Sequence, residues 1–124
     1  MKNFFKFALV LMATCFILQS CKKHKDTQYI TLNETVQSGT TYKLDISAYG
    51  DDDDVPSITT QAKSYDISQI NKDAVTARNI YSFAVTQKTA DKETVVITLK
   101  EEHRGRGGSC NKDEAVITIN FTIN

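Results

Sequence analysis

The chain has 124 residues, with 15 lysines and arginines against 15 aspartates and glutamates, three cysteines, one proline and no tryptophan. A chain of this length is enough for one small domain. The formal net charge of zero removes the usual electrostatic case for a nucleic-acid-binding protein, because such proteins carry clustered basic residues.

The first twenty residues have the layout of a secretory signal. Lys2 and Lys6 stand before an uncharged, mostly apolar run from Phe7 to Leu18, and small or polar residues follow it. This run is shorter than the ~20 residues that a membrane-spanning helix needs. We therefore expect residues 1–20 to be a cleaved signal peptide and not a permanent span.

Directly after the apolar run stands the sequence Leu18-Gln19-Ser20-Cys21. These residues resemble the lipobox of bacterial lipoproteins, which has a leucine three positions before the cysteine and a small residue just before it. The resemblance implies that Cys21 is acylated, palmitate included, and becomes the first residue of the mature chain. A thiolate is the nucleophile that such acylation needs, and several buried acyl chains hold a soluble domain at a bilayer. The alternative is a plain secretory signal with an incidental cysteine.

Residues 22–28, KKHKDTQ, contain no apolar side chain, and with Cys21 they predict a short basic tether. In many lipoproteins of the Bacteroidetes, an acidic run after the cysteine accompanies export to the cell surface. By the same resemblance, the basic run here favours an outer-membrane anchor that faces the periplasm. The simpler interpretation is a solvated linker whose lysines lie near anionic head groups.

Loss of the leader changes the cysteine and charge balance. Cys15 leaves with the leader and Cys21 carries lipid, so Cys110 is the remaining thiol and no disulfide is expected within the mature chain. Removal of Lys2 and Lys6 from the 15 basic side chains, against 15 acidic ones, gives a formal charge of −2. The mature protein is therefore a mildly acidic domain on a basic tether.

From Tyr29 onward the apolar residues recur with a period of two, which is typical of half-buried β-strands. The clearest example is the C-terminal run 115–123, and the same alternation is present over 42–47, 81–85 and 95–99. Shorter candidates are 29–32, 57–60 and 65–68. Residues 66–77 have a mixed pattern, and we interpret them as a loop with room for a short helix.

About seven short strands separated by turn residues predict an all-β fold, an antiparallel β-sandwich. Four segments resemble bacterial immunoglobulin-like domains of the cadherin-like type: a Leu-Asp-Ile-Ser strand that leads into an aspartate-rich turn (44–54), a Tyr-Ser-Phe strand (81–83), the run 93–98 and a terminal Val-Ile-Thr-Ile strand (116–119). The resemblance implies that residues 29–124 form one immunoglobulin-like domain.

The run Asp51-Asp52-Asp53-Asp54 is the most conspicuous charged motif. Consecutive carboxylates repel one another, so the run is either hydrated or neutralised by a cation, and calcium prefers oxygen ligands of this kind. In an extended segment Asp51 and Asp53 share one face, as do Asp52 and Asp54. We take Asp51 and Asp53 as candidate calcium ligands, with a solvated hairpin turn as the alternative.

The longest connection between two strong predicted strands covers residues 101–113. Arg104 and Arg106 lie among its glycines and are candidates for binding an anionic group, because arginine pairs with such groups and glycine allows close backbone approach. The connection also contains the side-chain types of a cysteine-nucleophile triad, His103, Cys110 and Asp113. These share one loop with no second loop to orient them, so we expect no enzymatic activity.

These features predict an envelope lipoprotein that is anchored through Cys21 and acts as a non-enzymatic interaction or structural module. Its expected partners are the membrane and an envelope protein or glycan, without nucleic acid. The alternative is a lipoprotein that binds a glycan or another ligand, with calcium at the aspartate run as the one candidate cofactor. A glycan site would need an exposed tyrosine cluster or a concave face, whereas the five tyrosines fall on separate predicted segments.

Overall fold

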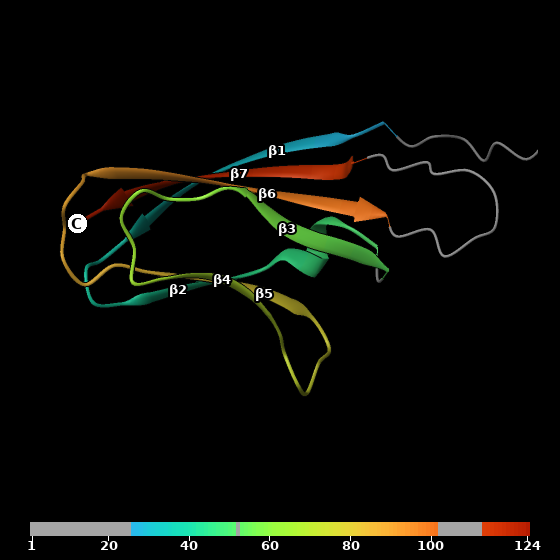
Figure 1. Cartoon of the computed structure of the whole chain (residues 1–124), viewed down its shortest axis with the longest axis horizontal. Helices are drawn as coiled ribbons and strands as arrows, with labels where there is room; N and C mark the ends of the chain where they lie inside the picture. The colour runs from blue at the N-terminus through green and yellow to red at the C-terminus, as the bar shows by residue number, and fades with distance from the viewer. Residues whose placement is uncertain (1–25, 52, 102–112) are drawn as a thin grey trace, which may run out of the picture.

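The computed structural model describes residues 26–51, 53–101 and 113–124, which form two packed β-sheets (Figure 1). The strands order as β1-β7-β6-β3 in one sheet and β2-β5-β4 in the other. The prediction of an all-β sandwich with about seven strands is confirmed. In chain order the elements are β1 (Gln28–Val36), β2 (Thr41–Asp45), the 3-10 helix η2 (Ile46–Tyr49), β3 (Asp54–Thr60), β4 (Ile67–Lys72), β5 (Asn79–Ala84), β6 (Lys92–Glu101) and β7 (Asp113–Ile123).

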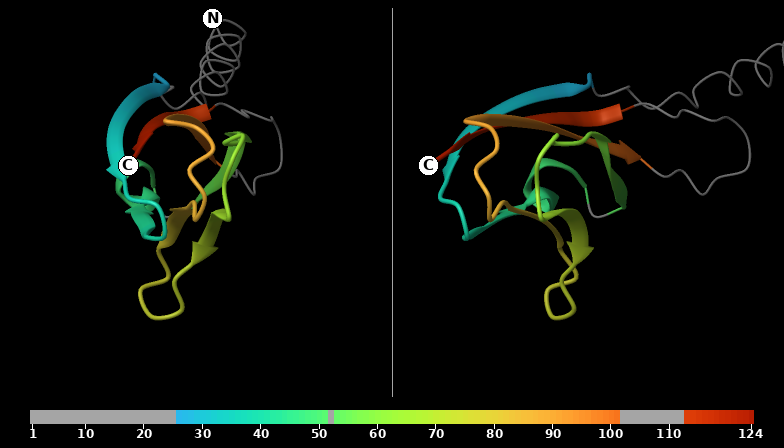
Figure 2. Two further views of the ribbon diagram at one scale, coloured as in Figure 1. Left: turned by 90° about the vertical axis from the view of Figure 1, so that its left-hand side faces the viewer. Right: turned by 60° about the vertical axis from the view of Figure 1, so that its left-hand side comes forward.

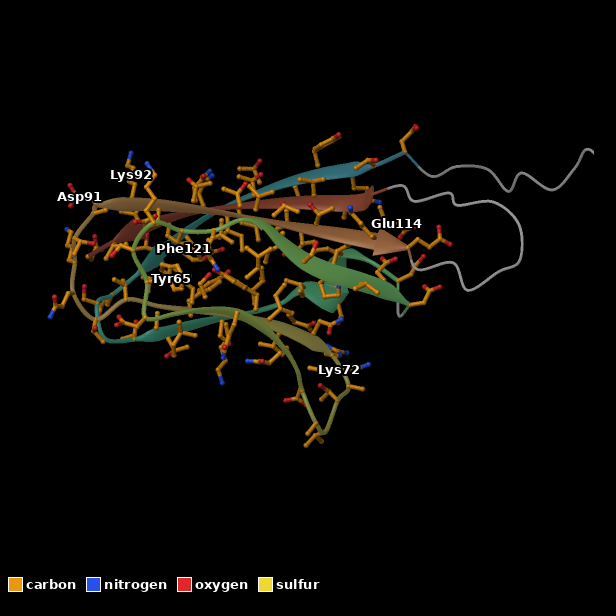
Figure 3. All side chains as sticks on the ribbon, in the orientation of Figure 1. Tyr65, Lys72, Asp91, Lys92, Glu114 and Phe121 are labelled. Carbon is orange, nitrogen blue, oxygen red and sulfur yellow. The ribbon has the colours of Figure 1, made fainter. Side chains whose placement is uncertain are left out.

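Alternate residues of the central strands fill the space between the two sheets. Every second residue of β7 from Ala115 to Ile123 is buried, which confirms the period of two in the sequence. The ring of Phe121 stacks on Phe83 with centroids 4.2 Å apart and meets the edge of Tyr42 at 5.2 Å. The core is therefore held by side chains from both sheets, with Phe121 between them toward the C-terminal end of β7 (Figure 3).

One strand pair departs from the predicted antiparallel arrangement. β1 runs parallel to β7, with Gln28 opposite Ala115 and Val36 opposite Ile123. The other pairs of the described sheets are antiparallel. Alternation reports which face of a strand is buried but not the direction of its neighbour, so the sequence could not exclude a parallel pair. β1 then curves along one edge of the sandwich toward β2 in the opposite sheet (Figure 2).

The interpretation of residues 66–77 as a loop is wrong for their first half. Ile67–Lys72 forms β4, which pairs antiparallel with β5, and only 73–78 make the turn between them. β4 lies at the edge of the three-stranded sheet, and Ile70 is its one side chain that packs against the core cluster. A strand that buries so little has a weak alternation, which explains why its pattern is mixed.

The connections gather at two ends of the sandwich (Figure 1). The start of β1, the end of β6, the start of β7, residues 46–51 and residue 53 lie at one end, which we call the N-terminal end. The C-terminal end holds the connections 37–40, 61–66 and 85–91 and the last residue. Backbone hydrogen bonds tie this end together, from Ser38 N to Asn124 O at 3.0 Å and from Gly39 N to Val85 O at 2.8 Å.

Candidate functional site

The aspartate run lies at the N-terminal end and leads directly into β3. Asp51 and Asp53 are exposed, whereas Asp54 is only 6% exposed. The Asp54 carboxylate Oδ2 accepts a hydrogen bond from the Asp51 backbone N–H at 2.7 Å, and the Asp54 N–H donates to the Asp51 carbonyl at 3.1 Å. The run is therefore not four equivalent solvated carboxylates, because its last member closes the turn.

The turn is also not the predicted hairpin. It connects η2, which follows β2 of the three-stranded sheet, to β3 of the four-stranded sheet, so it crosses between the layers. Gly50 is needed where this crossing is tightest, since a Cβ there would lie 2.8 Å from the Leu99 side chain and would also collide with the Asp54 carboxylate. Asp54 and Gly50 thus fit together as parts of one structural turn.

The calcium interpretation of Asp51 and Asp53 stays a prediction. In the part of the chain that the structure describes, no three histidine, cysteine or acidic side chains are grouped as they would be around a metal ion. The interpretation requires that calcium raise the melting temperature of the full chain and that Asp51→Asn with Asp53→Asn abolish the rise. A melt that does not respond to calcium would end it.

Three other predicted site residues cannot be placed. Cys21, Arg104 and Arg106 lie outside the described residues, as do His103 and Cys110. Lipid attachment at Cys21 and anion binding by the two arginines therefore remain predictions from the sequence. Among the described residues, no helix is long and apolar enough to span a bilayer.

The tyrosines do not form an exposed cluster. Tyr81 is fully buried and Tyr42 packs against the core, and burial raises the pKa of each phenol to about 12. Tyr29 is 81% exposed on β1 and Tyr65 is 43% exposed before β4. β1 is one edge of the four-stranded sheet, whereas β4 contacts β3 at the other edge, so these two rings cannot act on one ligand together.

The outward surface of the four-stranded sheet carries mostly uncharged polar side chains. Alternate positions of its strands carry small polar or apolar side chains and no charge between the two ends of the sheet. We call this surface the uncharged face. Its members are Tyr29, Thr31, Asn33 and Thr35 on β1, Val116, Thr118, Asn120 and Thr122 on β7, Thr94, Val96 and Thr98 on β6, and Ser57 and Thr59 on β3.

Side-chain hydrogen bonds run across the strands of the uncharged face. The Thr94 hydroxyl donates to the Asn120 Oδ1 at 3.1 Å, and the Asn120 Nδ2 donates to the Asn33 Oδ1 at 3.1 Å. At the other edge, the hydroxyl oxygens of Thr59 and Thr98 are 3.2 Å apart. The face is therefore an ordered array that connects β3 with β6 and β6 with β7 and β1.

The uncharged face was not identified from the sequence. The polar positions of the alternating pattern do hold a sign of it. The solvent-facing positions of β1 and β7 are mostly threonine and asparagine, where exposed strands often carry lysine or glutamate. The sequence could not show that β1 lies beside β7. Only the strand order brings the two polar rows together on one surface.

Comparison with known proteins finds likeness in structure but not in sequence. No family model matches the chain, and no curated protein matches it. A cysteine protease inhibitor from Entamoeba histolytica has a similar structure, with 10% identity, a TM-score of 0.46, and coverage of 80% of this chain and 98% of that one. A nucleoside hydrolase-related hypothetical protein from Saccharophagus degradans matches with 18% identity and a TM-score of 0.43 over 77% of this chain, which spans only 22% of that protein's chain. No activity is carried from either protein to this one.

Proposed function

We propose that the protein is a bacterial envelope lipoprotein, anchored through acylated Cys21, whose β-sandwich is a non-enzymatic interaction module. The observation that carries the anchor is the position of Leu18-Gln19-Ser20-Cys21 where the apolar run ends and polar sequence begins. Several acyl chains at one residue hold a soluble domain at a bilayer, because each buried methylene contributes about 0.8 kcal/mol.

The position of the first strand supports an anchor close to the domain. β1 begins at Gln28, so residues 22–27 alone separate Cys21 from the sandwich. Fully extended, this tether reaches about 20 Å. The N-terminal end of the sandwich would then face the membrane, and the C-terminal end would point away from it. Three lysines in the tether would lie near anionic head groups.

The non-enzymatic role is supported by how the buried polar groups are used. Among the described residues, the buried polar or charged side chains are Asp54, Glu93 and Thr98. Glu93 accepts hydrogen bonds from the backbone N–H groups of Lys63 and Ser64, Asp54 closes its turn, and Thr98 contacts Thr59. Each of these residues makes a structural contact, as expected of a scaffold, although the buried Oδ1 of Asp54 has no hydrogen-bond partner among the described residues.

Mass spectrometry of the full chain recovered from bacterial membranes tests the anchor. We expect a mature chain that begins at an acylated Cys21 and partitions with the membrane fraction. Cys21→Ser should leave the chain unacylated, and Cys110→Ser is the matched control because it removes a cysteine without touching the lipobox. Recovery of the unaltered chain as unmodified soluble protein would overturn the proposal.

A further inference from the structure

We infer that the uncharged face binds a neutral glycan chain through one exposed aromatic ring and an array of polar groups, and not through the tyrosine cluster or concave face that the sequence led us to expect of a glycan site. The inference deepens the proposed function, since it names a partner class for the interaction module. It stands on the arrangement of side chains over β1, β7, β6 and β3, and it does not depend on acylation of Cys21.

The charge distribution selects the chemical class of the ligand. Charged residues make up 24% of the chain, yet the alternate outward positions between the two ends of this sheet hold none. The uncharged face is bounded at one end by Lys92, which is in register with Thr122, and at the other by Glu114 and the exposed Lys100 (Figure 3). An anionic or cationic polymer would find no opposite charge between these ends, and desolvation of its charges would not be compensated. A ligand rich in hydroxyl groups meets threonine hydroxyls and asparagine amides, which both donate and accept hydrogen bonds.

The polar groups of the face are held in place before a ligand arrives. Asn120 is bonded to Thr94 on one side and to Asn33 on the other, so both amides have defined orientations. A hydroxyl and an amide each have further donor or acceptor capacity after one such bond. Binding to fixed groups loses less side-chain entropy than binding to mobile lysines or glutamates would.

Tyr29 supplies the apolar part of the site. Its side chain is 81% exposed and lies on the same face, in register with Val116 on the neighbouring strand. A sugar ring has an apolar face of C–H groups and a rim of hydroxyls, so it can rest on an aromatic ring while its rim reaches polar neighbours. Tyr29 and Val116 lie side by side on neighbouring strands, and the exposed Thr31, on the same face of β1, supplies a hydroxyl beside them.

The size of the face favours a narrow chain over a second copy of the protein. Four strands about 4.8 Å apart and seven residues of about 3.3 Å each give an area on the order of 400 Å². A stable protein dimer buries about 800 Å² on each partner. A polysaccharide chain needs only a strip of this surface, whereas a second copy would leave the interface incomplete.

Affinity electrophoresis of the full chain in non-ionic detergent tests the inference. The gels contain laminarin, galactomannan, yeast mannan or hydroxyethyl cellulose as neutral probes, and polygalacturonate as the charged probe. We expect retardation by at least one neutral polymer and none by polygalacturonate. Tyr29→Ala and Asn33→Asp, both at exposed positions, should weaken the apparent affinity about tenfold. Tyr65→Ala is the matched control and should leave the affinity unchanged, with circular dichroism confirming that all variants fold.

Three results would overturn the inference. One is no retardation by any neutral polymer, and another is retardation that Tyr29→Ala and Asn33→Asp leave unchanged. The third is a dimer, detected by light scattering, that Asn33→Asp dissociates, because the face would then bind a second copy. None of these results bears on acylation, which mass spectrometry measures separately, so failure of the glycan site and failure of the anchor are distinguishable.

Discussion

Glu93 is a buried carboxylate that fixes the connection between β3 and β4, and its replacement is the sharpest test of how the C-terminal end is built. Its side chain is 5% exposed, with Oε2 accepting from Lys63 N at 2.8 Å and Oε1 from Ser64 N at 3.1 Å. Glu93→Gln keeps one acceptor and turns an N–H₂ group toward the other backbone donor. Since a hydrogen bond to a charged group contributes about 1.5–3 kcal/mol, we expect a loss of about 2 kcal/mol. In a domain of this size that lowers Tm by about 10 °C.

Urea unfolding of the full chain measures the loss, and amide hydrogen exchange locates it. Exchange at Lys63 and Ser64 should accelerate in Glu93→Gln by more than exchange in β7. Asp91→Asn is the matched control, because the Asp91 side chain is 84% exposed and pairs with Lys88 at the surface. It should change stability by less than about 0.5 kcal/mol. An unfolding midpoint for Glu93→Gln equal to that of Asp91→Asn would refute the role assigned to the carboxylate.

The ring of Phe121 is 1% exposed and stacks on Phe83, so Phe121→Ala should cost about 4 kcal/mol in urea unfolding; a cost under about 1 kcal/mol would contradict its packing in the core. Gly50→Ala forces a methyl group against Asp54 and should cost about 1–3 kcal/mol. The double variant Gly50→Ala/Asp54→Ser should lose less free energy of unfolding than the two single variants lose together. Burial raises the pKa of Tyr42 and Tyr81 from 10.0 to about 12. The uncharged phenols favour the folded state. Their contribution to the free energy of unfolding is therefore present below pH 10 and is lost as the pH rises to 12. Phenolate absorbance of the folded protein should therefore still be rising near pH 12 as Tyr42 and Tyr81 ionise, and a rise that is complete by about pH 11 would contradict the assignment.

The strands that bury one full face were predictable from the sequence. β7 and the middle of β6 alternate between the core and solvent over many residues, and their apolar positions are the buried ones. The hydrophobic effect acts on every second residue of such a strand, so the pattern is visible in the chain itself. β4 contributes little more than Ile70 to the core, and the same argument therefore could not find it.

The role of individual polar residues was less predictable. Asp54 belongs to a run of four identical side chains, but it alone of the described three is buried and closes the turn. Glu93 lies in β6, where the other residues on the buried side are apolar, and its carboxylate is nevertheless buried. In both cases the partner is a backbone N–H group whose position depends on how the chain folds around it, 30 residues away for Glu93 and Lys63.

By itself the sequence determined the class of fold, through the period of its apolar residues. It also predicts a signal peptide through the order of charge and apolar run, and an acylated Cys21 through the resemblance of residues 18–21 to a lipobox. Only the tertiary structure decided which strands are neighbours, and it placed β1 parallel to β7 at the edge of the larger sheet. Strand pairing is a contact between distant segments, here between Asn33 and Asn120, and local composition does not encode it. The uncharged face exists because that pairing joins two polar rows, each of which alone is an ordinary solvent-facing side of a strand.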